Sequence, residues 1–413
     1  MHGRYLTEAI KTLAFTDHKM AFLSGPRQCG KTTLGKLLLK QYSRGSYHNW
    51  DDIEFRRLWA KDPKKIIVPQ EEKKGDAPLI ILDEIHKAKG WKRSLKGVYD
   101  TLASPADILV TGSARLNVYK KGGDSLLGRY YNFRLHPFSL GEILNRTPPT
   151  PDAFIKNIFE GETATTKTAQ SHLKALLEFG GFPQPFLSQD TKKARLWRQR
   201  RVEMVIREDL RDLSHLPELS KIEMLAALLP ERVGSLLSLN SLREDLEVSY
   251  DTVKRWLQLL SELYYVFRVQ PYSQSIKRSL KKESKLYLWD YSEIESKGGR
   301  LENLVACHLL KACHYWTDTG EGLFDLHYLR NKEKQEIDFL ITRDKKPWLP
   351  IEVKSQSEEL VPAWKKFLPM LPCNIGCQIV LAEKSAEKIS KKTEIVGGEV
   401  LVTPISRFLS ALV

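Results

Sequence analysis

The sequence predicts an α/β protein with a parallel sheet in its N-terminal third, a helical middle and a second α/β domain at the C-terminal end. From Met20 to about Pro137, short apolar runs alternate with helix-like stretches, which is typical of parallel strands joined by crossover helices. Apolar residues then recur mainly at helical spacing as far as about Val269. Strand-like and helix-like segments alternate again from Lys285 onward. We therefore expect four regions, at residues 1–145, 146–216, 217–272 and 273–413.

Length and composition support several globular domains. The chain has 413 residues, of which 42% are hydrophobic and 28% are charged. These values match ordinary globular proteins and exclude a largely disordered, collagen-like or coiled-coil chain. Lys and Arg outnumber Asp and Glu by 65 to 51, which gives a formal net charge of +14. This excess indicates a polyanionic partner, and DNA is the partner we expect.

The cysteines and the N-terminus indicate a cytoplasmic protein. Five cysteines, an odd number, fit a reducing compartment better than a disulfide framework. Cys373 and Cys377 form a Cys-x3-Cys pair, but no second Cys or His pair lies near it in the sequence, so zinc is not favoured. The N-terminus lacks the apolar segment of a signal peptide, and no run approaches the length of a membrane span. We therefore expect no contact with a membrane.

A nucleotide site is predicted at the end of the first strand, Met20–Ser24. There follows Gly25-Pro26-Arg27-Gln28-Cys29-Gly30-Lys31-Thr32, which matches G-x-x-x-x-G-K-[ST], and then a helix-like segment from Thr33 to Lys40. The glycines let the backbone wrap phosphates, and amides at the helix N-terminus point toward negative charge. Lys31 is expected to reach the outer phosphates as a catalytic residue, and Thr32 to ligate Mg²⁺. The expected nucleotide contacts in this segment are Gly25, Pro26, Arg27, Gln28, Cys29, Gly30, Lys31, Thr32 and Thr33.

The second half of this site follows the apolar strand Leu79–Leu82. Asp83 and Glu84 come directly after it, at the carboxyl end where open parallel sheets bind ligands. We expect Asp83 to hold Mg²⁺ through water and Glu84 to polarise the attacking water as a catalytic base. Taken alone, an acidic pair ending a strand is more often a solvated cap. Because a phosphate-binding loop motif precedes the pair in the sequence, we interpret Asp83 and Glu84 as part of a nucleotide site.

A third buried strand, Ile108–Thr111, ends in hydroxyl groups. Thr111 and Ser113 are suited to sensing the γ-phosphate or the attacking water, and they are equally compatible with ordinary strand-end caps. Arg129, next to Gly128, is the candidate catalytic arginine finger, which would contact the nucleotide of a neighbouring copy in a homo-oligomer. A surface arginine is the alternative interpretation.

These motifs resemble the AAA+-like P-loop ATPases of bacteria and archaea that carry a C-terminal domain of unknown function similar to PD-(D/E)XK nucleases. The resemblance covers nearly the whole chain and implies ATP binding and hydrolysis. It rests on residues 25–32, on LIILDEIH (79–86), on VTGSA (110–114), on 126–129, on LHPFSL (135–140), on FGGFP (179–183) and on REDL (207–210).

A second constellation lies near the C-terminus. Strand-like segments at Glu336–Ile341 and Trp348–Val353 carry Asp338 and Glu352. Because side chains alternate across a strand, Glu352 and Lys354 share one face, and a hairpin would bring Asp338 beside Glu352. Two carboxylates that bind Mg²⁺ and a nearby ammonium suit metal-assisted cleavage of a phosphodiester.

This arrangement resembles the D…(D/E)-x-K signature of PD-(D/E)XK nucleases. Glu302, at the head of a predicted helix from about Leu301 to Cys313, matches the extra acid of many members. The resemblance implies Glu302, Asp338 and Glu352 as metal ligands, with Asp338, Glu352 and Lys354 catalytic. A Glu-x-Lys on a half-exposed strand is also common as a solvated pair. A nuclease-like fold retained only as a DNA-binding shell is the other alternative.

Two basic clusters and a predicted winged helix are the candidate DNA contacts. Phosphate neutralisation by such clusters would give salt-sensitive binding without sequence preference, although a charge run is often only a solvated face. The expected recognition helix begins at Ser249, and it would either meet a groove of DNA or pack against neighbouring segments. The first cluster is Lys192, Lys193, Arg195, Arg198, Arg200 and Arg201 with Trp197 among them, the second is Lys277, Arg278, Lys281, Lys282 and Lys285, and the helix offers Ser249, Tyr250, Thr252, Lys254 and Arg255.

Three functions remain open from the sequence. The leading hypothesis is an ATPase that couples its nucleotide state to DNA binding, with Mg²⁺-dependent DNA cleavage by the C-terminal domain. The alternative is a nucleotide-controlled DNA- or protein-binding ATPase whose nuclease-like domain is inert. A third is a metal-independent ATPase that interacts with proteins and has no role with nucleic acid.

Overall fold

The computed structural model describes residues 3–67, 77–102, 104–112, 126–161, 166–210, 218–273, 283–356, 359–381 and 390–413. The chain forms two compact units, residues 1–137 and 138–413. The predicted helical, winged-helix-like and C-terminal regions all belong to the second unit, which also contains residues 138–145 of the predicted first region. Among the described residues, no helix combines the length and the apolar character that crossing a membrane requires.

The first unit is built on a parallel sheet, as predicted. Its strand order is β2-β3-β4-β1-β5, and every neighbouring pair is parallel. The three strands expected from the sequence are confirmed as β1, β3 and β4, and two further strands complete the sheet. The bounds are β1 Met20–Ser24, β2 Gly45–Asn49, β3 Leu79–Asp83, β4 Asp107–Gly112 and β5 Tyr130–Arg134.

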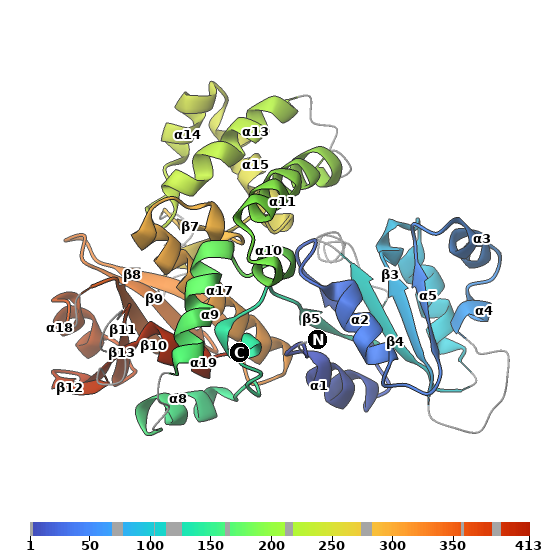
Figure 1. The fold of residues 1–413 in the computed structure, drawn as a ribbon, viewed down its shortest axis with the longest axis horizontal. Helices are drawn as coiled ribbons and strands as arrows, with labels where there is room; N and C mark the ends of the chain where they lie inside the picture. Colours follow the sequence, from blue (N-terminus) through green and yellow to red (C-terminus); the bar gives the residue numbers. More distant parts are fainter. Residues whose placement is uncertain are drawn as a thin grey trace. The chain divides into compact units, whose positions relative to one another are not determined.

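Helices cover both faces of this sheet (Figure 1). A Cβ at Gly35 of helix α2 would meet Ile81 and Leu109, which point to one face of β3 and β4. The residues next to them in sequence, Ile80 and Val110, join the core cluster that contains helix α5. Since successive strand residues point to opposite faces, α2 and α5 lie on opposite faces. The helices of the unit are α1 Thr7–Ala9, η1 Ile10–Phe15, α2 Lys31–Leu39, α3 Ile53–Lys61, α4 Lys64–Ile67, η2 Ile85–Lys87 and α5 Trp91–Asp100.

The second unit contains a mixed sheet of eight strands in the order β12-β13-β11-β10-β9-β8-β6-β7. Parallel pairs join β13 to β11, β11 to β10 and β8 to β6, and the other pairs are antiparallel. The bounds are β6 Val266–Pro271, β7 Lys285–Leu288, β8 Phe324–Arg330, β9 Glu336–Arg343, β10 Lys346–Lys354, β11 Ile375–Val380, β12 Lys391–Ile395 and β13 Gly398–Pro404.

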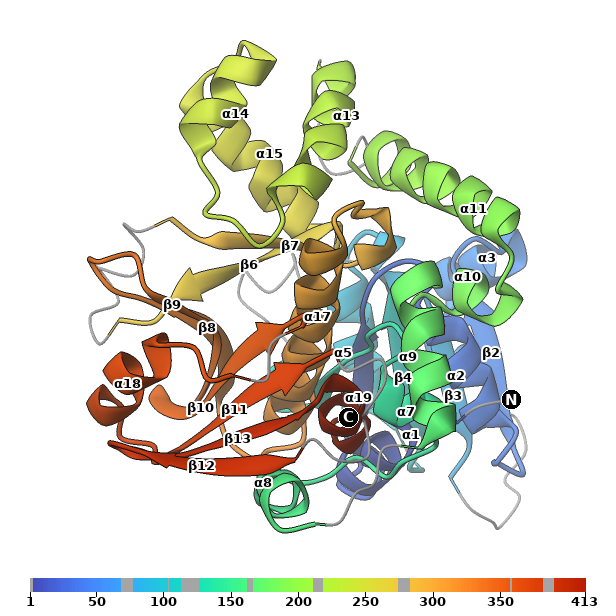
Figure 2. The same cartoon turned by 60° about the vertical axis from the view of Figure 1, so that its left-hand side comes forward.

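A long helix, α17 (Lys297–Asp318), lies beside this sheet (Figure 2). Its Asn303 is fully buried, and the side-chain amide of Asn303 both accepts from the Leu288 amide and donates to the Leu288 carbonyl, each at 2.7 Å. This pair of hydrogen bonds fixes α17 against β7. Because Glu302 precedes Asn303 in α17, these hydrogen bonds also fix the position of Glu302 relative to β7.

The remaining helices of the second unit include the segment predicted as a winged helix. Ser249 caps α15, because its Oγ accepts from the Thr252 amide at 3.1 Å, as the sequence suggested. The three helices α13–α15 lead into β6 and β7, which also belong to the larger sheet; the winged-helix assignment stays a prediction. The bounds are α7 Leu140–Ile143, α8 Pro151–Phe159, α9 Lys167–Phe179, α10 Pro183–Ser188, α11 Thr191–Glu203, η4 Met204–Leu210, α13 Leu219–Leu228, η5 Leu229–Arg232, α14 Leu239–Leu246, α15 Tyr250–Glu262, η6 Tyr291–Glu293, α18 Ala363–Phe367, η7 Leu368–Met370 and α19 Ile405–Ala411.

Candidate functional site

The loop between β1 and α2 has the shape that phosphate binding requires. A Cβ on Gly25 would lie 2.3 Å from the carbonyl oxygen of Leu135, so only glycine fits there. Gly30 has a φ of 98°, in the left-handed region, and α2 begins at the next residue, Lys31. The first amides of a helix have no acceptor inside it. They are therefore available to a phosphate bound in the loop.

Lys31 lies folded against this loop. Its side chain is buried, and Nζ donates to the carbonyl oxygens of Gly25 and Pro26 at 2.9 and 2.7 Å. Both acceptors are neutral. A phosphate oxygen carries negative charge and forms a stronger hydrogen bond with an ammonium. Lys31 can therefore exchange its carbonyl partners for a phosphate.

Three hydroxyl groups donate hydrogen bonds to the Asp83 carboxylate at the end of β3. Its Oδ2 accepts from Thr32 Oγ1 at 2.8 Å and from the Tyr47 hydroxyl at 2.7 Å, and its Oδ1 accepts from the Thr111 hydroxyl. Asp83 is only 3% exposed, and among the described residues it has no ion-pair partner. A buried carboxylate with neutral donors is ready to take a cation. The predicted contact Ser113 lies outside the described residues.

Glu84 lies beside this carboxylate in a left-handed backbone conformation with a φ of 58°. Its amide donates to the Thr111 carbonyl at 2.9 Å, which anchors the turn. Burial raises the pKa of the Glu84 carboxyl, and the charges of Lys31 and Lys87 oppose that rise. A carboxylate with a raised pKa, close to the loop lysine, is suited to accept a proton from water.

Arg129 occupies the other end of the sheet. The first residue of β1, Met20, pairs with Tyr130, whereas the phosphate loop follows the last residue of that strand. Arg129 donates to the carboxylate of Asp100 through Nε at 2.6 Å and Nη2 at 2.9 Å. Its position excludes contact with the nucleotide of its own loop. The predicted arginine finger could serve only a neighbouring copy, and it stays a prediction.

Two residues support the site without belonging to any sequence motif. Tyr47, on β2, donates to Asp83, and burial together with that hydrogen bond raises the pKa of Tyr47 to about 12. Arg4 is buried and donates to the carbonyls of Cys29 and His136 at 2.5 and 2.6 Å, bracing the loop from behind. Neither residue had a spacing that could have identified it.

The second unit brings the predicted acidic residues together. Glu302 comes from α17, Asp338 from β9, and Glu352 and Lys354 from β10. The Asp338 amide donates to Glu352 Oε2 at 3.1 Å, and the Val353 amide donates to Asp338 Oδ2 at 3.0 Å. Lys354 Nζ lies 2.8 Å from Glu352 Oε1. The hairpin expected from the sequence therefore places Asp338 beside Glu352.

An additional lysine lies among these acids, and the sequence did not indicate it. Lys285 Nζ is 3.4 Å from Glu302 Oε1, 3.4 Å from Asp338 Oδ1 and 3.5 Å from Glu336 Oε2. Its side chain is only 3% exposed. The hydroxyl of Tyr287, on the same strand β7, donates to Glu302 Oε1 at 2.7 Å. We call Lys285, Glu302, Asp338 and Glu352 the acidic cluster.

The electrostatics of the acidic cluster reflect burial and repulsion between carboxylates. Burial raises the pKa of Glu302 and of Glu352, the latter to about 7, and the charge of Asp338 adds to both. Burial alone would lower the pKa of Lys285, but Glu302 and Asp338 outweigh it, so the net shift is upward. Lys285 is therefore a charged ammonium at neutral pH.

The acidic cluster does not have the donor arrangement of a metal centre. Across the described ranges, no group of three or more His, Cys, Asp or Glu side chains is arranged to hold a metal ion. The predicted Mg²⁺ ligands Glu302, Asp338 and Glu352 are close, but Lys285 stands between two of them. Cleavage of DNA at this place stays a prediction.

The basic side chains divide into surface and core residues, contrary to their reading as continuous clusters. Arg201 is buried, 3.4 Å from Glu293 Oε1, with its guanidinium carbon 4.5 Å from the ring centre of Phe182. Trp197 and Lys285 are buried as well. Residues 277, 278, 281 and 282 lie outside the described ranges. Exposed basic residues remain on two helices, namely Lys192, Lys193, Arg195 and Arg200 on α11 and Lys254 and Arg255 on α15.

Comparison with known proteins agrees with this picture of the first unit. Residues 17–144 match a family model described as an AAA domain. Residues 170–293 and 297–400 match two models described as domains of unknown function. The N-terminal part of the chain is therefore similar to AAA domains of the P-loop ATPase type, as expected. The nuclease-like identity of the C-terminal region is not among these matches.

Several complete proteins are similar to most of the chain. An uncharacterised protein of Mycobacterium tuberculosis is 22% identical over 349 residues, which cover 82% of this chain and 70% of that protein. An uncharacterised protein of Haemophilus influenzae is 23% identical over 341 residues, covering 77% and 78%. Among solved structures, the Walker-type ATPase of Pyrococcus abyssi is 14% identical with a TM-score of 0.40, covering 70% of this chain and 94% of that one.

Proposed function

We propose that the protein is a Mg²⁺-dependent ATPase. The observation that carries this proposal is the contact between the Thr32 hydroxyl and the Asp83 carboxylate, 2.8 Å apart, at the foot of a loop that holds the Lys31 ammonium. Hydroxyl and carboxylate oxygens are the donors that Mg²⁺ prefers. Thr32 and Asp83 would hold the ion, which would offset negative charge on the phosphates of the nucleotide.

The residues of this site divide the work of hydrolysis. Amides of the loop and of the first turn of α2 bind the phosphates, and Lys31 offsets the charge that grows on the outer phosphoryl group. When bound, Mg²⁺ supplies further neutralisation of the same charge. Glu84 accepts a proton from water as the water oxygen bonds to the γ-phosphorus. The bond from that phosphorus to the bridging oxygen breaks, which gives ADP and phosphate.

Lys31→Ala tests this proposal. We expect ATP turnover to fall by about 10²–10³-fold, as for the loss of one preorganised charge contact. Lys40→Ala, an exposed lysine at the other end of α2, is the matched control and should leave turnover unchanged. Turnover by the Lys31→Ala protein equal to that of the wild type, or no turnover by the wild type with Mg²⁺ and DNA present, would refute the proposal.

We further propose that the second unit binds DNA under the control of the nucleotide. The support is the net charge of +14 and the exposed basic residues of α15, where Lys254 and Arg255 follow an exposed Tyr250. Side chains of this kind neutralise phosphates and lend an aromatic face for stacking on bases. A nucleotide bound in the first unit would then change affinity for DNA.

Charge reversal on α15 tests DNA binding. For Lys254→Glu with Arg255→Glu, we expect the slope of log affinity against log salt to decrease by about 2, because each lost phosphate contact removes about one unit. Lys345→Glu with Lys346→Glu reverses the same charge on an exposed hairpin and serves as control. Fluorescence anisotropy with duplex and single-stranded DNA, with and without ATP, gives the affinity. No retention of either DNA at moderate salt would favour the ATPase that interacts with proteins.

A further inference from the structure

We propose that the ammonium of Lys285 is a built-in cation that replaces a metal ion in the acidic cluster, so that the second unit is not a metal-dependent nuclease. This inference goes beyond the ATPase activity and is independent of it. It concerns residues 285, 302, 338 and 352 of the second unit alone.

The ammonium of Lys285 lies among the oxygens of three carboxylates. Lys285 Nζ lies within 3.5 Å of oxygens from Glu302, Asp338 and Glu336, which come from helix α17 and strand β9. A cation that links several carboxylates from separate elements occupies the place a metal would take. Lys285 reaches this place because side chains alternate between the two faces of β7. Lys285 and Tyr287 therefore share one face of the strand, and both contact Glu302.

The carboxylate oxygens of Asp338 and Glu352 already accept from donors of the protein. Both oxygens of Asp338 are used, Oδ1 by Lys285 and Oδ2 by the Val353 amide. Both oxygens of Glu352 are used as well, Oε1 by Lys354 and Oε2 by the Asp338 amide. A divalent ion would have to share these oxygens with donors that are already in place, and two of those donors, Lys285 and Lys354, carry a positive charge that competes with the ion.

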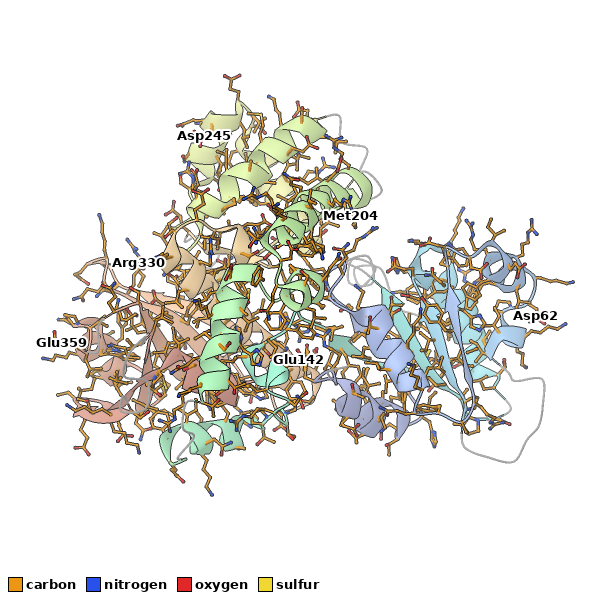
Figure 3. All side chains as sticks on the ribbon, in the orientation of Figure 1. Asp62, Glu142, Met204, Asp245, Arg330 and Glu359 are labelled. Carbon is orange, nitrogen blue, oxygen red and sulfur yellow. The ribbon has the colours of Figure 1, made fainter. Side chains whose placement is uncertain are left out.

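Lys285 balances the charge of carboxylates that are partly withdrawn from water. Isolated buried charges are costly unless they are paired. Glu336 is also paired outside the cluster, with Arg330 of β8, which Figure 3 labels. Adding a divalent ion while Lys285 stays would force two cations together with little water to screen them. If Lys285 moved away to admit the ion, its ammonium would lose these carboxylate partners and would need others.

Removing the ammonium should therefore create a metal site. In Lys285→Met the side chain keeps its length and loses its charge, so Glu302 and Asp338 are left without their cation. Binding of Mn²⁺ to nucleotide-free, full-length protein can be followed by the paramagnetic resonance of free Mn²⁺. We expect Lys285→Met to bind one more Mn²⁺ per chain than the wild type, with affinity at least roughly tenfold above any wild-type binding at this place.

Two controls locate that ion. Asp338→Asn added to Lys285→Met should abolish the extra binding, because it removes a ligand. Lys354→Met, the loss of the neighbouring lysine, should produce no extra binding, because Lys285 still links Glu302 and Asp338. Weak Mn²⁺ binding through Asp83 in the first unit is common to all these proteins and cancels in the comparison.

Measurements on the wild type keep the proposal open to refutation even if Lys285→Met fails to fold. We expect wild type and Asp338→Asn to bind Mn²⁺ equally, and supercoiled and linear DNA to stay intact with Mg²⁺ or Mn²⁺. Wild-type binding that Asp338→Asn removes, or cleavage that both Asp338→Ala and Glu352→Ala abolish, would overturn the proposal. A folded Lys285→Met protein without extra Mn²⁺ binding would do the same. ATP turnover, governed by Lys31, is unaffected by any of these results.

Discussion

The two carboxylate sites of this molecule contain similar groups and differ in what neutralises them. In the first unit, Asp83 accepts hydrogen bonds from hydroxyls, and Lys31 donates to backbone carbonyls rather than to a carboxylate. In the second unit, Lys285 donates directly to Glu302 and Asp338. A lysine held by neutral acceptors can be released to an incoming phosphate. A lysine enclosed by carboxylates completes its own charge balance and leaves no demand for a further cation.

The same contrast separates a binding site from a structural network. The hydroxyls that donate to Asp83 can rotate, so Thr32 and Asp83 would be free to hold Mg²⁺, which would offset phosphate charge. The acidic cluster offers no such exchange, since main-chain amides of β9 and β10 take part in it. An acidic residue and a lysine at suitable spacing therefore do not by themselves define a metal site. The partners of each oxygen decide the matter.

The largest expected effect on stability comes from Lys285. Lys285→Met should lower the free energy of unfolding by about 3 kcal/mol, the low end of the range for a broken buried ion pair, because it leaves partly buried carboxylates without their cation. Urea denaturation of the full chain measures the loss, and added Mn²⁺ should recover part of it only in this variant. Lys346→Met, at an exposed hairpin position, is the control. A loss no larger than the control's would mean that the ammonium is not the cation of the cluster.

The corresponding change in the first unit should affect turnover and spare stability. Glu84→Gln removes the proton acceptor but keeps the shape of the side chain, so kcat should fall by about 10²–10⁴-fold. Titration calorimetry should show ATP binding close to that of the wild type. Glu54→Gln, an exposed change on α3, is the control. Unchanged kcat would remove Glu84 from the mechanism.

Much of the first unit could be predicted from the sequence because its signals are local. The strands β1, β3 and β4 are apolar runs buried on both faces, and the loop motif needs a glycine at fixed positions for steric reasons that Gly25 illustrates. The hairpin that joins Asp338 to Glu352 was predictable for the same reason, since alternation and a turn suffice. These features depend on residues that are close together in the sequence.

What could not be predicted depends on contacts between distant segments. Lys285 reads as one more residue of a basic run, yet it is buried among acids from α17 and β9. Arg201 and Trp197 were counted with exposed basic residues, and both are core residues. Burial of a charged side chain is rare enough that sequence alone favours the surface. Tyr47 is a similar case, because nothing in its own segment points to Asp83.

A smaller effect is expected from Tyr47. Tyr47→Phe removes one donor to Asp83 and leaves the Thr32 and Thr111 hydroxyls in place, so kcat/KM should fall by roughly 2- to 10-fold, equivalent to one ordinary hydrogen bond of about 0.5–1.5 kcal/mol. Tyr42→Phe is a matched control, because Tyr42 donates to Asp107 at 2.7 Å at the opposite end of the sheet. The control should lose similar stability and keep its ATPase activity. Equal loss of activity in both would show that Tyr47 acts only on the fold.

The smallest effect is a pH dependence confined to the second unit. The pKa of Glu352 is raised from its ordinary 4.5 to about 7 by burial and by the charge of Asp338. The folded protein thus binds this proton more tightly than the unfolded chain does. The resulting stabilisation is complete below the unfolded pKa and is lost as pH rises through the folded one.

Urea midpoints measured across this pH window can isolate the contribution of Glu352. We expect Glu352→Gln to flatten the fall in stability between pH 4.5 and about 7, the interval that separates the two pKa values. Glu394→Gln, an exposed change on β12, should leave the slope as it is in the wild type. An unchanged slope in Glu352→Gln would mean that the hydrogen bond and charge of Lys354 outweigh burial and the charge of Asp338, so that Glu352 does not take up a proton in this pH window.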